Sequence, residues 1–250
     1  MDRHQWEGPV STASSVDFAN IVIQGKGLNA LGTELLAGLR DQIAAAGDRP
    51  ILLTGAAPAF SAGLNLKEVV AMDEPQMHAF LELLDAVVTG LYVHPAPTVA
   101  VVDGHAIAGG AVLARACDVV VGREGGRGRV GLNEVAIGLR FPPRVLRMLT
   151  SKLPRRHHTE VILGAGLHLP ESACRLGLVD TLAADPLAEG MARLHALAAH
   201  PREAYAAAKH ALQEGVTDVS TEEQASFAEE VVPVWTSDAV KAKIRAILQK

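Results

Sequence analysis

The sequence predicts an α/β fold with a helical C-terminal third. From about residue 16 to Pro142, short apolar runs of strand length alternate with stretches whose apolar residues recur at helical spacing. After Pro142, helical patterns dominate. The 250 residues are 49% hydrophobic, which is enough apolar material for one large core. No fixed-period repeat or low-complexity linker marks a second independent domain.

The elements of the α/β part follow from these two patterns. The stretch 33–46 is predicted to be helical because Leu36, Leu39 and Ile43 fall on one face. Continuous apolar runs between turn residues are predicted to be buried strands. In chain order the expected elements are strand 19–23, helix 33–46, strand 50–54, helix 66–72, helix 75–92, strand 98–102, helix 109–116 and strand 118–121.

The remaining chain is predicted to be mostly helical, and the N-terminal residues are predicted to be loose. The expected helices cover residues 143–152, 156–163, 170–176, 186–199, 202–214 and, with breaks, 221–247. Residues 1–15 are polar and lack periodicity, so they are expected to form a flexible tail. The predicted organisation is therefore a tail over 1–15, a core over 16–190 and a helical region over 191–250.

Composition excludes several classes of partner and site. The 23 Lys and Arg nearly balance the 28 Asp and Glu, which argues against nucleic acid and anionic membranes as partners. The only cysteines, Cys117 and Cys174, cannot form a disulfide framework or a four-ligand zinc site, and no metal is expected. Neither a signal peptide nor an apolar run of membrane-spanning length is present, so a soluble protein of the reducing cytoplasm is expected.

Two glycine-containing turns each connect a buried strand to a helix. In residues 59–68 (AFSAGLNLKE), Asn65 is a candidate N-cap and Glu68 is placed to complete a capping box, which puts the Leu64 N–H at a helix entrance. Residues 103–110 (DGHAIAGG) form the second turn. Free N–H groups at such turns favour developing negative charge, so two turns side by side would form an oxyanion hole. The alternative is that the glycines only permit tight turns.

Glu134 is the best candidate for proton transfer. Val135, Ala136 and Ile137 follow it, and burial among apolar residues raises a carboxyl pKa toward the range useful for a proton shuttle. The alternative is a solvated surface glutamate.

Three other motifs do not predict a catalytic, cofactor or metal site. Residues 122–129 (GREGGRGR) follow a strand but precede no helical pattern, so they are predicted to form a loop and not a dinucleotide site. Ser61 lacks the preceding glycine of a hydrolase nucleophile elbow. His157 and His158 are adjacent and would point in different directions on a helix.

Several motifs, taken in order and spacing, resemble the crotonase family, also called the enoyl-CoA hydratase/isomerase superfamily. The resemblance covers nearly the whole chain from Val16. The motifs that carry it are residues 60–64 (FSAGL), 100–110 (AVVDGHAIAGG), 117–118 (CD), 131–134 (GLNE), Gly164 and 177–180 (GLVD). The resemblance implies a spiral of ββα units, acyl-CoA thioester substrates with no separate cofactor, and a C-terminal region that assembles a homotrimer or a dimer of trimers.

The resemblance also implies roles for particular residues. It places the oxyanion hole on the backbone N–H groups of Leu64 and Gly109. Substrate-binding positions carry over to residues that surround these donors and the coenzyme A entrance: Lys26, Ala62, Leu66 and Gly110. For Lys26, a merely solvated lysine is the alternative interpretation.

The reaction implied depends on which acid/base groups are present. Hydratases of the family carry two glutamates; Val112 stands at the first of these positions and Glu134 at the second. Moving a double bond from the 3 to the 2 position needs one base, so the chain looks most like a 3,2-trans-enoyl-CoA isomerase. A weak hydratase, another acyl-CoA hydrolase or lyase, and a catalytically weak acyl-CoA-binding member remain alternatives.

Two features leave questions open within this family. Asn65 stands where the family usually has Asp, although both residues cap helices equally well. The resemblance also places Arg140 near the acyl pocket. It either selects an anionic acyl group or makes a surface or subunit contact, and the second interpretation is favoured.

Overall fold

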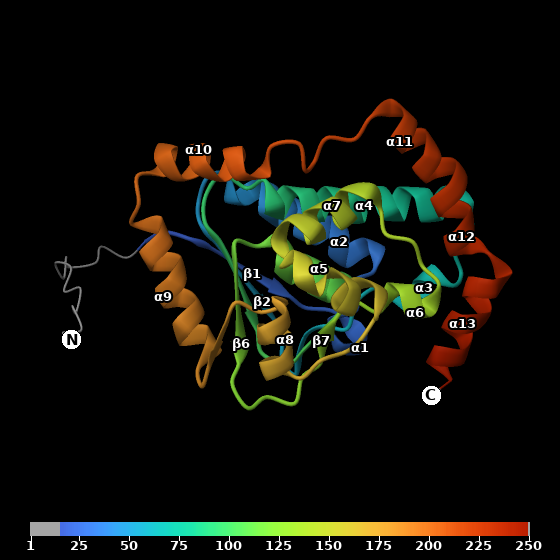
Figure 1. The fold of residues 1–250 in the computed structure, drawn as a ribbon, viewed down its shortest axis with the longest axis horizontal. Coiled ribbons are helices and arrows are strands. Elements are labelled where there is room, and N and C mark those ends of the chain that lie inside the picture. Colours follow the sequence, from blue (N-terminus) through green and yellow to red (C-terminus); the bar gives the residue numbers. More distant parts are fainter. Residues whose placement is uncertain (1–15, 250) are drawn as a thin grey trace.

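The computed structural model describes residues 16–249 (Figure 1), so the predicted tail over residues 1–15 lies outside the described part. Within this described part, eight strands form two sheets whose paired strands all run parallel. The larger sheet has the order β1 (Ala19–Ile23), β2 (Ile51–Gly55), β4 (Thr98–Val102), β6 (Val119–Arg123) and β8 (Thr181–Ala183). The smaller sheet has the order β3 (Ala59–Ser61), β5 (His105–Ile107) and β7 (Val130–Gly131).

The chain alternates between the two sheets. A strand of the larger sheet is followed by a short strand of the smaller sheet, as in β2 to β3, β4 to β5 and β6 to β7. A helix then begins within a few residues, which completes a ββα unit. Stacking three such units gives the predicted α/β spiral, which is thereby confirmed. The ends of β3, β5 and β7 all lead to one region of the molecule.

The helices of the spiral cover the sheets and fill the core. They are α1 (Lys26–Asn29), α2 (Thr33–Ala46), α3 (Leu66–Val69), α4 (Glu74–Tyr92), α5 (Gly109–Ala116), α6 (Glu134–Ile137), α7 (Pro143–Lys152) and α8 (Pro170–Leu176). The long helix α4 begins with a capping box between Asp73 and Gln76, which satisfies backbone groups at its first turn. Its buried face, which includes Phe80 and Leu84, packs against α2, α5 and α7.

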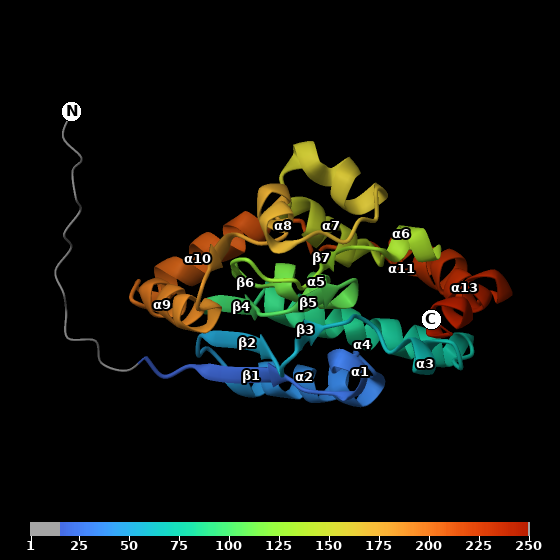
Figure 2. The same cartoon turned by 90° about the horizontal axis from the view of Figure 1, so that it is seen from below.

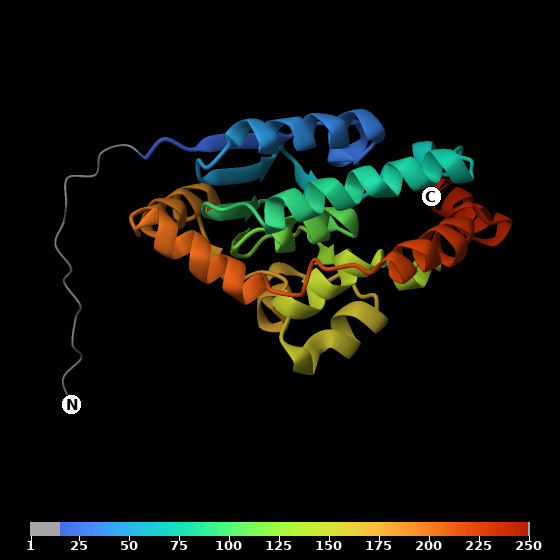
Figure 3. The same cartoon turned by 90° about the horizontal axis from the view of Figure 1, so that it is seen from above.

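The C-terminal elements lie at two opposite ends of the spiral (Figures 2 and 3). At one end α9 (Pro186–Ala198) packs on β4 and β6, and α10 (Arg202–Gln213) follows it. At the other end lie α11 (Thr221–Ser226), α12 (Val232–Thr236), which contacts α4, and α13 (Asp238–Leu248), which contacts α3 and α6. The boundary predicted after residue 190 therefore falls inside α9, and the last elements pack directly on the spiral.

Several local predictions need correction. The helix predicted over 156–163 is a 3-10 turn, Arg155–His157, followed by a π-helix, Thr159–Leu163, and a second π-helix, Phe227–Val231, connects α11 to α12. The helix predicted over 66–72 ends as a regular helix at Val69. Strands β3, β5, β7 and β8 were not predicted, because two or three residues show no measurable alternation. No helix within residues 16–249 is long and apolar enough to cross a bilayer.

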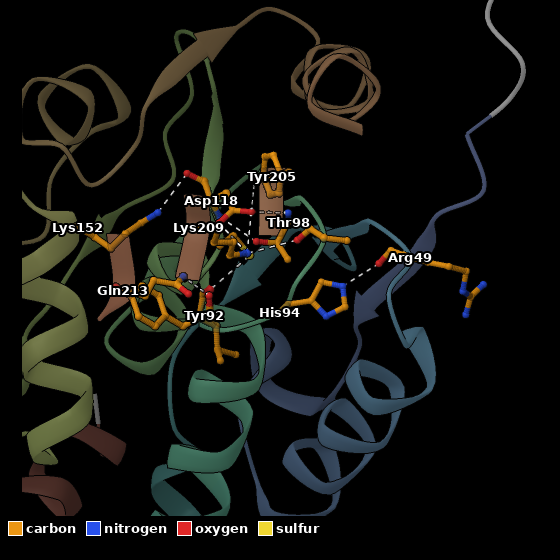
Figure 4. A network of polar contacts seen from close by, with 12 residues as sticks. Arg49, Tyr92, His94, Thr98, Asp118, Lys152, Tyr205, Lys209 and Gln213 are labelled. Atoms are coloured by element: carbon orange, nitrogen blue, oxygen red, sulfur yellow. Dashed lines mark hydrogen bonds and ion pairs between the residues drawn. The ribbon is translucent and has the colours of Figure 1, made fainter. Parts of the chain in front are cut away.

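A buried polar network attaches α10 to the larger sheet (Figure 4). Lys209 Nζ lies 2.8 Å from Asp118 Oδ1, and the Tyr205 hydroxyl donates to Asp118 Oδ2 at 2.8 Å. The Thr98 N–H donates to the same carboxylate at 2.9 Å. Lys209 is buried and also donates to the carbonyl of Ala96. The network therefore joins α10 to the starts of β4 and β6.

We expect Lys209→Met to lower the free energy of unfolding by about 3 kcal/mol, because the Asp118 carboxylate, whose side chain is only 16% exposed, would lose its cation. Urea unfolding followed by circular dichroism measures the change. Arg193→Met is the matched control, since it removes an exposed ion pair with Glu189 on α9 and should cost less than about 1 kcal/mol. Small and equal losses in both variants would contradict a stabilising role for the network.

Candidate active site

A cavity of about 240 Å³ lies where the ends of the short strands meet the C-terminal helices. Its walls come from the two glycine-containing turns, from α6 and the segment that follows it, and from α12 and α13. Most lining residues are apolar, and they include Leu84, Val112, Ile137, Leu139, Phe141, Val145, Leu167, Trp235 and Ile247. A cavity with mostly apolar walls and a few polar groups is typical of a small-molecule site.

The two predicted donors, Leu64 and Gly109, both line this cavity. The turns that carry them touch, because a Cβ atom added to Gly63 would lie 2.7 Å from the Ile107 carbonyl oxygen and 3.5 Å from Gly109 N. Within residues 16–249 neither the Leu64 N–H nor the Gly109 N–H donates a hydrogen bond. Two unengaged donors on neighbouring turns are suited to bind one oxyanion.

Hydrogen bonds and close packing hold both turns in place. Leu31 brackets the first turn, donating to the Gly63 carbonyl at 2.8 Å and accepting from Asn65 N at 2.9 Å. The second turn is fixed by Ala108 N, which donates to the Gly131 carbonyl at 2.8 Å. Ala108 has φ 49°, an unusual conformation for a residue with a side chain, and it immediately precedes Gly109 at the start of α5.

The predicted capping box between Asn65 and Glu68 is wrong. Asn65 makes no side-chain cap hydrogen bond at the start of α3. The Glu68 carboxylate instead accepts from the backbone N–H and the hydroxyl of Thr33, at the first turn of α2. Glu68 therefore caps a helix that is distant in sequence, because the first turn brings α3 beside α2.

Glu134 is buried at the cavity wall, so the alternative of a solvated surface glutamate is wrong. Its exposed fraction is 6%, and Oε2 has no hydrogen-bond partner in the described part of the chain. Burial raises the pKa of its carboxyl from 4.5 to about 7. A carboxyl with this pKa can both accept and release a proton near neutral pH.

The remaining polar groups of the wall are few. Val112 contributes an apolar surface, and Glu134 is the only carboxylate among the described lining residues. Sequence reasoning missed Asn133, whose Oδ1 is buried without a partner. Asn133 precedes the first residue of α6 but makes no side-chain cap bond. The only sequence signal at this position was its membership of the motif 131–134.

Two of the four predicted substrate-binding residues line the cavity and two do not. Ala62 and Leu66 line the cavity. Gly110 lies behind the wall, where a Cβ atom would meet the Ser61 carbonyl oxygen at 2.5 Å, so it allows close packing of the two turns. Lys26 is exposed on α1 and does not line the cavity.

Arg140, which was expected to make a surface or subunit contact, lines the cavity. Within residues 16–249 no three His, Cys, Asp or Glu side chains gather as a metal site.

Comparisons with known proteins agree with the fold. A Thermus thermophilus protein that carries the name of an enoyl-CoA hydratase is 35% identical over 156 residues, covering 61% of this chain and 60% of that protein. The 2,3-dehydroadipyl-CoA hydratase of Escherichia coli is 30% identical over 200 residues, covering 74% of each chain. Human mitochondrial delta3-delta2-enoyl-CoA isomerase superposes with a TM-score of 0.85 at 21% identity, covering 92% of this chain and 93% of that chain.

Hydratase and isomerase names both occur among these proteins. The chain spans 60% of the Thermus protein and about a third to a half of three further curated relatives. A family model covers much more of the sequence. Because residues 17–244 match the model described as Enoyl-CoA hydratase/isomerase, the chain belongs to that family.

Proposed function

We propose that this protein isomerises 3-enoyl-CoA thioesters to 2-enoyl-CoA thioesters. The observation that carries the proposal is that Glu134 is the single carboxylate among the described lining residues of the cavity. Val112, which also lines the cavity, stands where the resemblance places the first hydratase glutamate. Coenzyme A enters as part of the substrate, and no separate cofactor is needed. In this proposal the backbone of Ala62 and Leu66 contacts the adenine end of coenzyme A, and Lys26 binds the coenzyme A phosphates.

The proposed reaction moves one proton. The Glu134 carboxylate accepts a proton from C2, and the C–H electron pair forms the enolate, whose oxygen takes the negative charge. The N–H groups of Leu64 and Gly109 stabilise that oxygen, each by about 3 kcal/mol. The enolate then re-forms the carbonyl and places the double bond between C2 and C3, while the π electron pair of the former C3–C4 double bond forms the new C4–H bond with the proton from Glu134.

Label transfer tests this mechanism. A 3-enoyl-CoA that carries deuterium at C2 should give a 2-enoyl-CoA with part of the deuterium at C4, because the buried Glu134 returns the proton before solvent exchanges it. Mass spectrometry after single turnover measures the retained label. Formation of a 3-hydroxyacyl-CoA with complete loss of the label would contradict the proposal.

The isomerisation rate should depend on pH through Glu134. Since the base must be deprotonated, kcat/KM should rise with pH and level off above about 7, the raised pKa of this carboxyl. Below that pH the rate should fall tenfold per unit. Initial rates between pH 5 and pH 9 measure the profile, and a flat profile from pH 5 upward would exclude this carboxyl as the base.

We also propose that the protein assembles as a trimer or a dimer of trimers. The segment between α7 and α8 projects from the body (Figure 2), and it exposes Leu163, Leu167 and Leu169. The neighbouring Val161 and Ile162 are buried within the chain and so do not contribute to this surface. Light scattering at micromolar concentration should report a trimer or hexamer, and a monomer alone would contradict the proposal.

A further inference from the structure

Arg140 has a fixed backbone on the wall of the cavity. The side chains on either side of it, Leu139 and Phe141, line the same cavity. Trp235 Nε1 on α12 donates to the Arg140 carbonyl oxygen at 3.0 Å. The backbone position of Arg140 is therefore set by the helix that closes the cavity.

The guanidinium group of Arg140 is nearly unengaged. It makes no hydrogen bond within residues 16–249, and its nearest carboxylate, Glu230 Oε2, lies 3.9 Å from Nη1. Both side chains of this pair are more than half exposed, at 56% and 66%, so the pair contributes little. By contrast, Arg144 pairs with Asp85 at 2.6 Å and donates to the Thr217 carbonyl.

The surroundings of Arg140 favour an anionic occupant. A guanidinium group offers its donors in a planar fork that matches a carboxylate. A purely hydrocarbon acyl chain would displace water from this group without replacing its hydrogen bonds, which is unfavourable. Among the lining residues that the structure describes, Glu134 is the only carboxylate. Burial raises the pKa of its carboxyl to about 7, and the proposed function uses it for proton transfer.

We propose that Arg140 binds a terminal carboxylate on the acyl chain, so that the preferred substrates are thioesters of unsaturated dicarboxylic acids. This inference rests on the proposed function, because it assumes that a thioester occupies the cavity. The phosphates of coenzyme A are the other anions that such a substrate brings. Glu230 then acts as the partner of Arg140 in the empty site, and the substrate carboxylate replaces it.

Matched substrates test the inference. Thioesters of 3-enoic acids and of the corresponding 3-enedioic acids, from six to ten carbons, are compared as coenzyme A esters and as N-acetylcysteamine esters, which carry no phosphate. For the best chain length we expect kcat/KM to favour the dicarboxylic substrate by about tenfold or more on both carriers, as for a charge-assisted contact. No preference on either carrier would overturn the inference.

Variants then assign the preference to Arg140. Arg140→Met should reduce the ratio of dicarboxylic to monocarboxylic kcat/KM to about one, and Arg140→Lys should keep part of it, because charge remains without the fork. Arg193→Met on α9 is the control and should retain the full ratio. An unchanged ratio in Arg140→Met would overturn the inference. So would an equal loss on both coenzyme A esters with none on the phosphate-free esters, since Arg140 would then bind a phosphate.

A binding measurement separates this inference from the proposed function. Calorimetric titration with hexanoyl-CoA and adipoyl-CoA needs no turnover. Tighter binding of adipoyl-CoA that disappears in Arg140→Met supports the carboxylate contact even where isomerisation is absent. Equal binding of the two saturated thioesters would overturn the contact even where isomerisation is observed.

Discussion

Glu134→Gln should lower kcat for the isomerisation of 3-enoyl-CoA by about 100-fold or more, the scale of general acid–base catalysis. Glutamine has nearly the same shape, but its amide cannot accept the C2 proton. Because Glu134 is buried with one oxygen unpaired, the neutral amide should be accommodated without loss of the fold. Steady-state rates measured by product formation, together with thioester binding, test this expectation.

A second glutamate provides the control for this substitution. Glu124 is exposed in the loop between β6 and β7, so Glu124→Gln removes the same charge without touching the cavity. That variant should turn over at the rate of the unsubstituted protein. Near-normal turnover by Glu134→Gln would remove Glu134 from the mechanism.

Gly110→Ala should reduce kcat by about 100-fold or more, the cost of losing one donor from an oxyanion hole. The added Cβ atom would lie 2.5 Å from the Ser61 carbonyl oxygen, so β3 and the start of α5 must move apart. That movement changes the spacing between the Leu64 and Gly109 N–H groups, which these two segments position. Rates and thermal unfolding are measured on the same preparation.

Gly38→Ala is the matched control, because a Cβ atom at Gly38 in α2 meets nothing within 4 Å. It should leave the rate unchanged and stabilise the helix by up to about 1 kcal/mol. If Gly110→Ala unfolds near the normal temperature and keeps full activity, the close packing of the two turns does not position the donors.

The sequence predicted long elements better than short ones. Helix 33–46 and strand 98–102 agree with α2 and β4 to the residue, because each carries a clear apolar pattern over its whole length. The strands of the smaller sheet are too short to show such a pattern. Glu68 illustrates a further limit, since its hydrogen-bond partner Thr33 is 35 positions away and no local rule selects it.

The candidate site was likewise only partly predictable from the sequence. Glu134 was predictable from the surrounding motif. Its apolar neighbours were a poorer guide, because Val135 and Ala136 are exposed although Glu134 is buried. For Arg140 the resemblance indicated a place near the acyl pocket, but a surface or subunit contact was favoured. Its neighbours on the cavity wall could not be read locally, because the cavity is closed by Trp235 and Ile247, about a hundred positions further along the chain. Asn133 was missed because it counted only as part of the motif 131–134, and nothing in the local sequence indicates that its Oδ1 is buried without a partner.

Product identification with 3-enoyl-CoA and 2-enoyl-CoA substrates of several lengths tests the central claim most directly. With Val112 in place of a second carboxylate, Glu134 has no partner to deliver a water molecule. The account predicts conversion of 3-enoyl-CoA to 2-enoyl-CoA with little or no 3-hydroxyacyl-CoA from either substrate. Rapid hydration of crotonyl-CoA, with 3-enoyl-CoA left unchanged, would contradict it.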